Sequence, residues 1–500
     1  MGRITSKYGN LNTVGFADFS GGINTSNAEE MIAPNELSKC INMELDASTG
    51  LLKTVAGTVR VFTDDKNFRA FFWDGINECF ILTNQAGEIF KYDDELAKIG
   101  ELTGLLRPAF SVWEDGVIIA SGGKLQYWNG TAVVDLANSP EHSNGVFVAN
   151  GRVITWFDDI LYFSSVGDEE TWAEISDDDS SGKWIEVGYK DGGAITGVVN
   201  LSSDILIVKS NSHAYHLAGD YPNWVLKEIS RSAHSKGERS CIAVGNEALV
   251  LGDFALQSIS TTADYGDMRL SDISKKVKAE IYSLPKGTTL KYIPALNQIW
   301  IITGKRRFMF LDVATGGYFE RKFTNEVYDA LSVDDVTYVL KENGICKLQN
   351  DSPEDDGTLI EWQFHCKTNV ADNRYLVKRV RFDVTPDTNT RYDCNIFVGH
   401  LGLAAAMPRY ASSVYGDKTT VYHSPREVYE PHAQPEYNNS EDVYDSTEEI
   451  YGSDMPLVVV NMYRADVRCC QKLSSVRTRA QGHGGQFMIN SIKYDVVEVL

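Results

Sequence analysis

Residues 110–128 read FSVWEDGVIIASGGKLQYW: a short apolar run, a tight polar turn, and a second apolar run before another turn. An antiparallel strand with one face in water needs only half of its residues to be apolar. Turn sequences such as WEDG contain residues that reverse the chain within a few positions. The stretch therefore predicts consecutive antiparallel strands.

The same pattern recurs along the chain in units that begin near residues 70, 110, 146, 196, 241, 290 and 331. Successive starts lie 40, 36, 50, 45, 49 and 41 residues apart, which matches the about 40–50 residues of a four-stranded propeller blade. One such unit cannot bury both of its faces, so the units must pack on one another. We therefore predict an all-β protein with a β-propeller of six or seven blades over residues 56–355. A strand from residues 50–67 is expected to close the ring with the last blade.

Outside the repeats, two short helices are predicted. Residues 1–55 are rich in turns and are expected to form an N-terminal arm. Within this arm, residues 34–40 (PNELSKC) predict a short helix that has Pro34 in its first turn. A second helix is predicted near residues 270–284, where a capping serine precedes apolar residues at helical spacing.

Beyond residue 357 the blade spacing ends and longer strand-like segments appear. Residues 359–364 and 380–384 alternate apolar and polar side chains, as half-buried strands do. Similar patterns return in residues 457–467 and 487–499. We predict a β-sandwich-like C-terminal domain formed by residues 356–401 and 457–500.

The two halves of this domain are separated by an insertion, residues 402–456, that contains ten acidic and three basic residues. Tyrosine recurs there at intervals of 7, 7, 8, 7 and 7 residues: Tyr415, Tyr422, Tyr429, Tyr437, Tyr444 and Tyr451. One aromatic position per heptad makes no coiled-coil seam, and three prolines would break a helix. Two interpretations remain open. The tyrosines either stack on neighbouring subunits or line a channel, or the insertion is an acidic loop that arose by duplication.

The charge balance is strongly acidic, with 47 basic and 69 acidic residues and a net charge of −22. Such a chain is not expected to grip nucleic acid, because phosphate contacts need clustered Lys and Arg. The balance indicates either a solubility effect or a surface that does not retain a passing polyanion. No apolar run approaches the roughly 20 residues that a bilayer requires, so no membrane association is predicted. The eight cysteines form no CxxC pair, and we expect reduced thiols and assembly in a reducing cytoplasm.

Sequence motifs for chemistry are weak. The chain lacks a P-loop and a GxSxG elbow. His213 and His216 are three apart on an expected strand, so they point to opposite faces and are interpreted as exposed edge histidines. Residues 174–179 (EISDDD) offer oxygen ligands for calcium, or form a solvated loop. Four tryptophans are interpreted as blade core: Trp73, Trp113, Trp128 and Trp156. We predict no enzyme activity, no cofactor and no metal site.

Two stretches resemble tail proteins of short-tailed bacteriophages, of the tail nozzle or packaged-DNA-stabilisation (tail hub) type. The first contains FSGGINT (residues 19–25), followed by IAPNE (32–36), CIN (40–42), GLLK (50–53) and Gly57. The second contains ILYFS (160–164), followed by Gly167, Asp168, Trp172, ITG (195–197) and LIVK (206–209). The resemblance spans most of the chain, but the tyrosine repeat belongs to no pattern of this family.

The resemblance implies a structural protein of the virion tail, assembled in the host bacterial cytoplasm. Its propeller-bearing subunits would form a ring, expected to be a hexamer, below the portal and adaptor, in contact with other tail proteins. The ring would form the exit channel for double-stranded DNA, retain the genome and then release it. The acidic charge agrees with DNA that passes without specific binding. The alternatives are a monomeric propeller that binds host glycans and a propeller that cleaves them.

The insertion should be dispensable for folding, because both of its flanks have the pattern of complete strands. Deleting residues 402–456 is expected to leave a soluble chain with an unchanged circular dichroism spectrum and thermal midpoint. An insoluble or molten deletion variant would show instead that the insertion belongs to the core of the sandwich.

Overall fold

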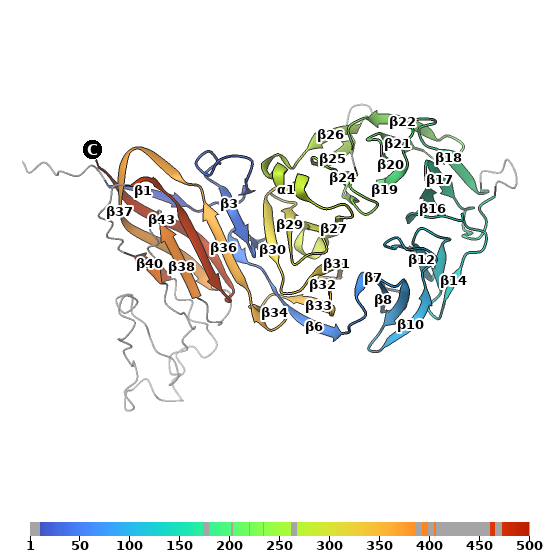
Figure 1. Ribbon diagram of the computed structural model, residues 1–500, viewed down its shortest axis with the longest axis horizontal. Helices are drawn as coiled ribbons and strands as arrows, with labels where there is room; N and C mark the ends of the chain where they lie inside the picture. The colour runs from blue at the N-terminus through green and yellow to red at the C-terminus, as the bar shows by residue number, and fades with distance from the viewer. Residues whose placement is uncertain are drawn as a thin grey trace, which may run out of the picture. The chain divides into compact units, whose positions relative to one another are not determined.

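The computed structural model describes residues 11–173, 180–201, 204–219, 221–233, 235–261, 268–386, 393–398, 405–406, 461–465 and 473–499 (Figure 1). Nearly all of the regular structure in these ranges is β-strand. The one α-helix among them, α1 (Lys278–Ser283), follows a 3-10 turn, η1 (Lys275–Val277), which confirms the helix predicted near residues 270–284. The chain divides into a propeller unit, residues 60–308 and 325–347, and a sandwich unit, residues 1–59, 309–324 and 348–500.

The propeller unit contains five four-stranded antiparallel sheets, each formed by four consecutive strands. The first two sheets comprise β7 (Phe68–Asp74), β8 (Cys79–Asn84), β9 (Glu88–Tyr92), β10 (Leu96–Glu101), then β11 (Ala109–Trp113), β12 (Gly116–Ala120), β13 (Gln126–Trp128) and β14 (Val133–Asp135). The third and fourth comprise β15 (Val146–Ala149), β16 (Arg152–Phe157), β17 (Ile160–Phe163), β18 (Lys183–Glu186), then β19 (Ile195–Leu201), β20 (Asp204–Lys209), β21 (Ala214–Ala218) and β22 (Val225–Ser230). The fifth comprises β23 (Cys241–Val244), β24 (Glu247–Leu251), β25 (Leu256–Thr261) and β26 (Met268–Asp272).

Two further repeats follow in the chain. The sixth begins with the hairpin of β27 (Thr289–Ile293) and β28 (Gln298–Ile302), whose two strands are connected by a 3-10 turn, η2 (Pro294–Leu296). The strands β29 (Arg307–Asp312) and β30 (Tyr318–Lys322) follow. The seventh contains β31 (Val327–Val333), β32 (Val336–Lys341) and β33 (Gly344–Gln349). Its sheet gains β6 (Gly57–Thr63) beside β33. A strand from residues 50–67 therefore closes the propeller, as predicted, and the repeats of the described chain number seven.

Apolar clusters join successive sheets of the propeller unit. The second strands β8 and β12 are buried along their whole length. One cluster unites Ile154 and Phe163 of the third sheet with Ile207 and Leu217 of the fourth. Another unites Phe71 and Phe80 of the first sheet with Leu340 and Ile345 of the seventh repeat. Each fully buried side chain of this kind contributes about 1.5–3 kcal/mol, so the ring is held by its inter-sheet cores.

The sandwich unit contains two sheets. In the first sheet the strand order is β4-β5-β43-β37-β40, and β1 also pairs with β43 and β41 with β37. In the second sheet the order is β30-β3-β36-β42-β38-β39, and β2 also pairs with β3. Their bounds are β1 (Leu11–Phe16), β2 (Gly22–Ile23), β3 (Glu36–Ile41), β4 (Met43–Leu45), β5 (Leu52–Thr54), β36 (Glu361–Cys366), β37 (Asn369–Pro386), β38 (Asp393–Val398), β39 (Ala405–Ala406), β40 (Asn461–Ala465), β41 (Leu473–Val476), β42 (Thr478–His483) and β43 (Phe487–Val499). Two short strands, β34 (Glu354–Asp355) and β35 (Thr358–Leu359), pair with each other. A β-sandwich-like C-terminal part therefore accompanies the propeller, as predicted.

The helix predicted over residues 34–40 is wrong, because this segment forms β3. Its backbone pairs in parallel with β2 and antiparallel with β36. The Glu36 carboxylate accepts hydrogen bonds from the Ala33 backbone and the Asn24 side chain, both at 2.8 Å. Pro34 therefore precedes a strand, and the strand ladder outweighs the local helix signal. Residues 11–54, expected as an arm, supply five strands to the two sheets.

The backbones of β6 and β33 lie very close together at Gly344. Gly344 opens β33 with a φ of 123°, and a Cβ there would overlap the carbonyl oxygen of Phe62 in β6. We expect Gly344→Ala to lower the stability of the propeller by about 2–5 kcal/mol, the sum of backbone strain and overpacking. The thermal midpoint, followed by tryptophan fluorescence, measures the effect.

Gly245 gives the matched control, because its φ of 58° is also positive but no atom lies within 4 Å of a Cβ built there. Gly245→Ala should cost only the strain, about 1–2 kcal/mol. Equal losses for the two variants would contradict a tight contact between β6 and β33.

Candidate functional site

The first strands of neighbouring repeats lie side by side around the propeller axis. Contacts between the strand pairs β7–β31, β11–β15, β19–β23, β23–β27 and β27–β31 define this inner ring, and Figure 1 shows the sheets radiating from it. We call the end of the propeller unit where these first strands begin the basal face. Side chains that enter or start the first strands meet there.

Five charged side chains meet at the axis of the basal face. They form what we call the axial cluster: Arg69 on β7, Arg107 two residues before β11, Arg239 two residues before β23, Lys291 on β27 and Asp329 on β31. Asp329 is 2% exposed. Its carboxylate lies 3.0 Å from Nη2 of Arg107 and 3.0 Å from Nζ of Lys291. One buried anion therefore pairs with cations from two other repeats.

Two arginines of the axial cluster, Arg107 and Arg239, connect repeats that are not neighbours. Arg107, from the second repeat, donates hydrogen bonds to Oγ1 of Thr289 at 2.9 Å and to the Tyr328 carbonyl at 2.7 Å. Arg239, from the fifth, donates to the Arg107 carbonyl at 2.7 Å and to the Asn144 carbonyl at 3.3 Å. A planar guanidinium presents several donors in a rigid geometry. These bonds brace the basal face across the axis.

Burial and mutual repulsion shape the pKa values in the cluster. Burial opposes the ionised form of Asp329, but Lys291 and Arg107 outweigh it and lower the pKa of the carboxyl. Burial lowers the pKa of Arg239 to about 10, and Arg107 acts in the same direction. The pKa of Arg69 is lowered by burial and by Arg107. At neutral pH the carboxylate is ionised and the guanidinium groups keep their charge.

This arrangement is suited to holding repeats together rather than to a reaction. The cluster contains no hydroxyl or thiol nucleophile beside a base, which covalent catalysis requires. No group of three His, Cys, Asp or Glu side chains in the described part of the chain is placed to hold a metal ion. Likewise, no helix within the described ranges is long and apolar enough to cross a membrane.

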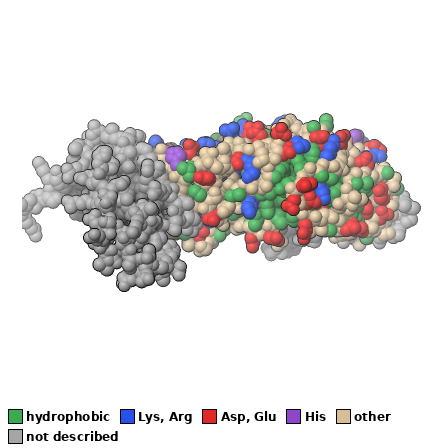
Figure 2. All heavy atoms as spheres, turned by 90° about the horizontal axis from the view of Figure 1, so that it is seen from below, with side chains coloured by type: hydrophobic (Ala, Val, Ile, Leu, Met, Phe, Trp, Pro, Cys, Tyr) green, Lys and Arg blue, Asp and Glu red, His purple; other side chains and the backbone are tan. Residues whose placement is uncertain are grey.

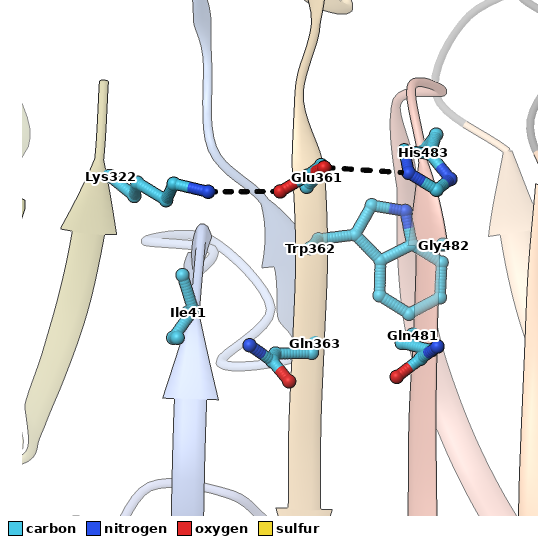
Figure 3. Close-up of a pocket in the computed structure, with 8 residues that line it drawn as sticks. All are labelled: Ile41, Lys322, Glu361, Trp362, Gln363, Gln481, Gly482 and His483. Atoms are coloured by element: carbon cyan, nitrogen blue, oxygen red, sulfur yellow. Dashed lines mark hydrogen bonds and ion pairs between the residues drawn. The ribbon is translucent and has the colours of Figure 1, made fainter. Parts of the chain in front are cut away.

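A second charged group lines a hollow of about 230 Å³ in the sandwich unit (Figure 3). Glu361 of β36 accepts a hydrogen bond from Nζ of Lys322 at 2.9 Å, and Nε2 of His483 lies 3.7 Å from its other oxygen. The bond from Lys322 is the main cause of the lowered pKa of Glu361. Glu361 is the one carboxylate among the lining residues, whereas most glycosidases need two. The hollow therefore does not have the composition of a glycoside-cleaving site.

The motif residues near the N-terminus form a packing node of the sandwich unit. Gly22 has a φ of 63°, and a Cβ there would lie 2.5 Å from the backbone nitrogen of Tyr318. Asn24 bonds to Glu36, as described above, and joins the FSGGINT and IAPNE stretches. The Asn42 side chain accepts from the Lys322 backbone and donates to the Glu361 carbonyl, both at 2.7 Å. These residue types are explained by backbone geometry and buried hydrogen bonding.

The second motif forms a capped turn after β17. The Asp168 carboxylate accepts bonds from the Glu170 backbone at 2.9 Å and the Thr171 hydroxyl at 2.7 Å. The Thr171 bond is the main cause of the lowered pKa of Asp168. Trp172 donates its indole N–H to the Glu169 carbonyl at 2.7 Å. This motif, too, has a structural role in the propeller.

The two histidines and four tryptophans singled out in the sequence all lie within the propeller unit. His213 lies 2.8 Å from Glu228, whereas His216 lies 3.0 Å from Asp204, so the two rings have different partners. His216 is buried rather than exposed, because its strand β21 is an inner strand of its sheet. Trp113, Trp128 and Trp156 are buried and Trp73 packs against the core, which confirms their assignment to the blades. Residues 174–179 and the six insertion tyrosines, from Tyr415 to Tyr451, lie outside the described residues.

The axial cluster has no counterpart in the sequence predictions. Its members come from five repeats, and no local motif marks them. The available signal was positional: Arg107 and Arg239 each stand two residues before the first strand of a repeat. Aligning the repeats by their first strands would have shown charged residues gathered at the start of these strands.

Comparison with known proteins adds little beyond the fold. No protein-family model matches the chain, and no curated protein sequence matches it. Among solved structures, it is similar to the β-propeller domain of Cps50 (Swd1) from Myceliophteria thermophila, at 10% identity and a TM-score of 0.39, over 59% of this chain and 99% of that one. It is also similar to BamB from Moraxella catarrhalis, at 12% identity and a TM-score of 0.34, over 59% and 97%. The WD40 β-propeller domain of Doa1 matches at 11% identity and a TM-score of 0.39, over 59% and 95%.

Replacing the buried anion of the axial cluster tests its bracing role. In Asp329→Asn, Arg107 and Lys291 lose their charged partner, and breaking a buried ion pair costs about 3–5 kcal/mol. We expect a clearly lower thermal midpoint at pH 7. The matched control is Glu228→Gln, which removes a surface carboxylate paired with the exposed Arg231 and with His213 and should change the midpoint far less.

The pH dependence follows from the lowered pKa of Asp329. An Asp in an unfolded chain titrates near about 3.9, and the folded value lies below it. The stabilisation is therefore complete above the unfolded pKa and is lost as pH falls through the folded pKa. The midpoint difference between wild type and Asp329→Asn should shrink between about pH 5 and pH 3. A difference that is constant over this range would contradict an ionised Asp329.

Proposed function

We propose that this protein is a structural component of a bacteriophage tail, a nozzle or hub whose copies form a ring around the path of DNA. The ring, expected to be a hexamer, would lie below the portal and adaptor, retain the packaged genome and release it at infection. The protein would act in the virion without enzymatic activity, after assembly in the bacterial cytoplasm.

The observation that carries the proposal is the resemblance of two stretches, residues 19–57 and 160–209, to tail nozzle and hub proteins. Both have structural roles here: the first forms the node around Asn24 and Asn42, and the second forms the capped turn at Asp168. Motifs that specify backbone geometry identify a fold rather than a function, so the support that they give to the proposal is the resemblance itself.

The closed axis of the propeller also supports the proposal. Arg107 and Arg239 cross the basal face, so the propeller of a single chain is braced rather than open there. A path for double-stranded DNA would then run between subunits of a ring, not along the axis of one propeller. A propeller whose repeats are connected across the axis is suited to a subunit that must withstand the pressure of packaged DNA.

The distribution of charge agrees with DNA that passes without being held. Figure 2 shows the propeller unit edge-on, with acidic side chains spread over this side and basic and hydrophobic side chains between them, and the net charge of the chain is −22. Phosphates approaching such a surface meet net repulsion within a Debye length, about 8 Å at physiological salt. A ring of several acidic subunits would therefore favour sliding over binding.

A propeller protein that binds glycans is the second candidate, here through a hollow in its sandwich unit. The observation in its favour is the hollow of Figure 3, where Gln363, Gln481 and His483 accompany Glu361. Polar side chains of this kind can fix the orientation of a hydroxylated ligand. The hollow holds a single carboxylate, which favours binding over cleavage.

Size-exclusion chromatography with light scattering separates these candidates. The tail proposal predicts an assembly of ring size, either from the protein alone or on addition of a portal–adaptor complex. Glycan binding would be favoured if the protein formed no ring under either condition and bound specifically to a glycan array, and if Glu361→Gln abolished that binding. Release of sugar from a polysaccharide, abolished by replacing one carboxylate, would show an enzyme and contradict both.

A further inference from the structure

An exposed aromatic pair stands out on the basal face of the propeller unit. Phe254, between β24 and β25, and Tyr282, on α1, stack with ring centroids 6.0 Å apart and planes at 24°. They are 61% and 67% exposed. A single exposed apolar residue is ordinary, but a stacked pair presents a continuous apolar surface that water covers at a cost.

Basic residues outnumber acidic ones in the sequence of α1 and its flanks, whereas Asp253 directly precedes Phe254. Residues 268–288 contain five basic residues, Arg269, Lys275, Lys276, Lys278 and Lys286, and two acidic ones, Asp272 and Glu280. Lys278 lies four residues before Tyr282, so the two share one face of α1. The Lys278 side chain is 60% exposed, and the nearest carboxylate oxygen, on Asp272, is 4.0 Å from its Nζ. We call Phe254, Tyr282, Lys278 and Lys286 the basic aromatic patch.

The position of the patch is fixed by the propeller core. Ile281 of α1 is buried, and Nζ of Lys236 donates to the carbonyl oxygens of Ile281 at 2.9 Å and Leu284 at 2.7 Å. These bonds hold α1 against the segment that leads into β23. The patch is therefore presented on a rigid support, which reduces the entropy lost when a partner binds.

A complementary sequence occurs in the same chain. Residues 402–456 contain ten acidic and three basic residues and seven tyrosines, of which six recur at near-heptad intervals. Carboxylates complement the lysines of the patch, and tyrosine rings complement both its aromatic rings and its ammonium groups. Elsewhere the chain offers DNA mainly repulsion, because its net charge is −22. The sign and the aromatic content of the patch thus match this segment better than they match a polyanion.

We propose that the basic aromatic patch binds the acidic tyrosine-repeat segment, residues 402–456, of a second copy of this chain. Such a contact would link copies in one direction around a ring, since patch and segment are different surfaces. The inference rests on the self-assembly included in the proposed function. It assigns the six tyrosines to an interface between subunits rather than to the lining of a channel.

Site-specific photo-crosslinking in the full-length chain tests this contact. A photoreactive phenylalanine analogue replaces Tyr282 in an unlabelled copy, which is mixed with an isotopically labelled copy under conditions of assembly. Mass spectrometry should find the crosslink in residues 402–456 of the labelled copy. The yield should fall at least about tenfold with Lys278→Glu and Lys286→Glu together, and in about 0.5 M salt, where attraction between exposed charges is screened.

The matched control carries the photoreactive residue at Val134, an exposed apolar position on β14 beside Asp135, and should not crosslink to residues 402–456. Crosslinks that stay within one copy, that reach other segments, or that disappear when short duplex DNA is added would overturn the proposal. An assembled ring with no crosslink from position 282 would refute this interface and leave the proposed function standing. A chain that never assembles would contradict both.

Discussion

Apolar cores between the sheets hold the propeller ring, and the buried ion pair between Arg107 and Asp329 is the interaction that connects its repeats across the basal face. A carboxylate that is 2% exposed would destabilise the fold if it were unpaired, and here it is paired with cations from the second and sixth repeats. The same Arg107 offers its backbone carbonyl to Arg239. The apolar cores lie between neighbouring sheets, whereas the axial cluster connects non-adjacent repeats at the basal face.

The propeller ring is also closed between its last and first repeats, in addition to the contacts of the axial cluster. The strand β6 joins the last repeat through β33, and the cluster around Phe71 and Leu340 packs the first repeat against the last. In the part of the propeller that the structure describes, the first and last repeats thereby cover each other's faces, and such contact between units is the general condition for the stability of repeats. In a tail nozzle these two closures would let each subunit act as a rigid part, while contacts between subunits decide how the assembly opens.

Sequence periodicity predicted the fold well because the blade pattern is local. The spacing of seven units, the closing strand and the helix near α1 all follow from short-range alternation and turns. The segment PNELSKC failed because its strand pairing with β2 and β36 comes from distant residues. The axial cluster was beyond reach for the same reason: Arg107 and Asp329 meet only after the ring has closed. The hollow at Glu361 likewise combines residues from strands far apart in sequence.

Cryo-electron microscopy of the purified assembly would decide whether the copies form a ring around DNA. We expect a closed ring in which the side chains of Arg107 and Arg239 brace each propeller at its own axis, and in which a passage wide enough for duplex DNA runs between the subunits. A monomeric particle, or an assembly in which DNA occupies the axis of a single propeller, would contradict this expectation.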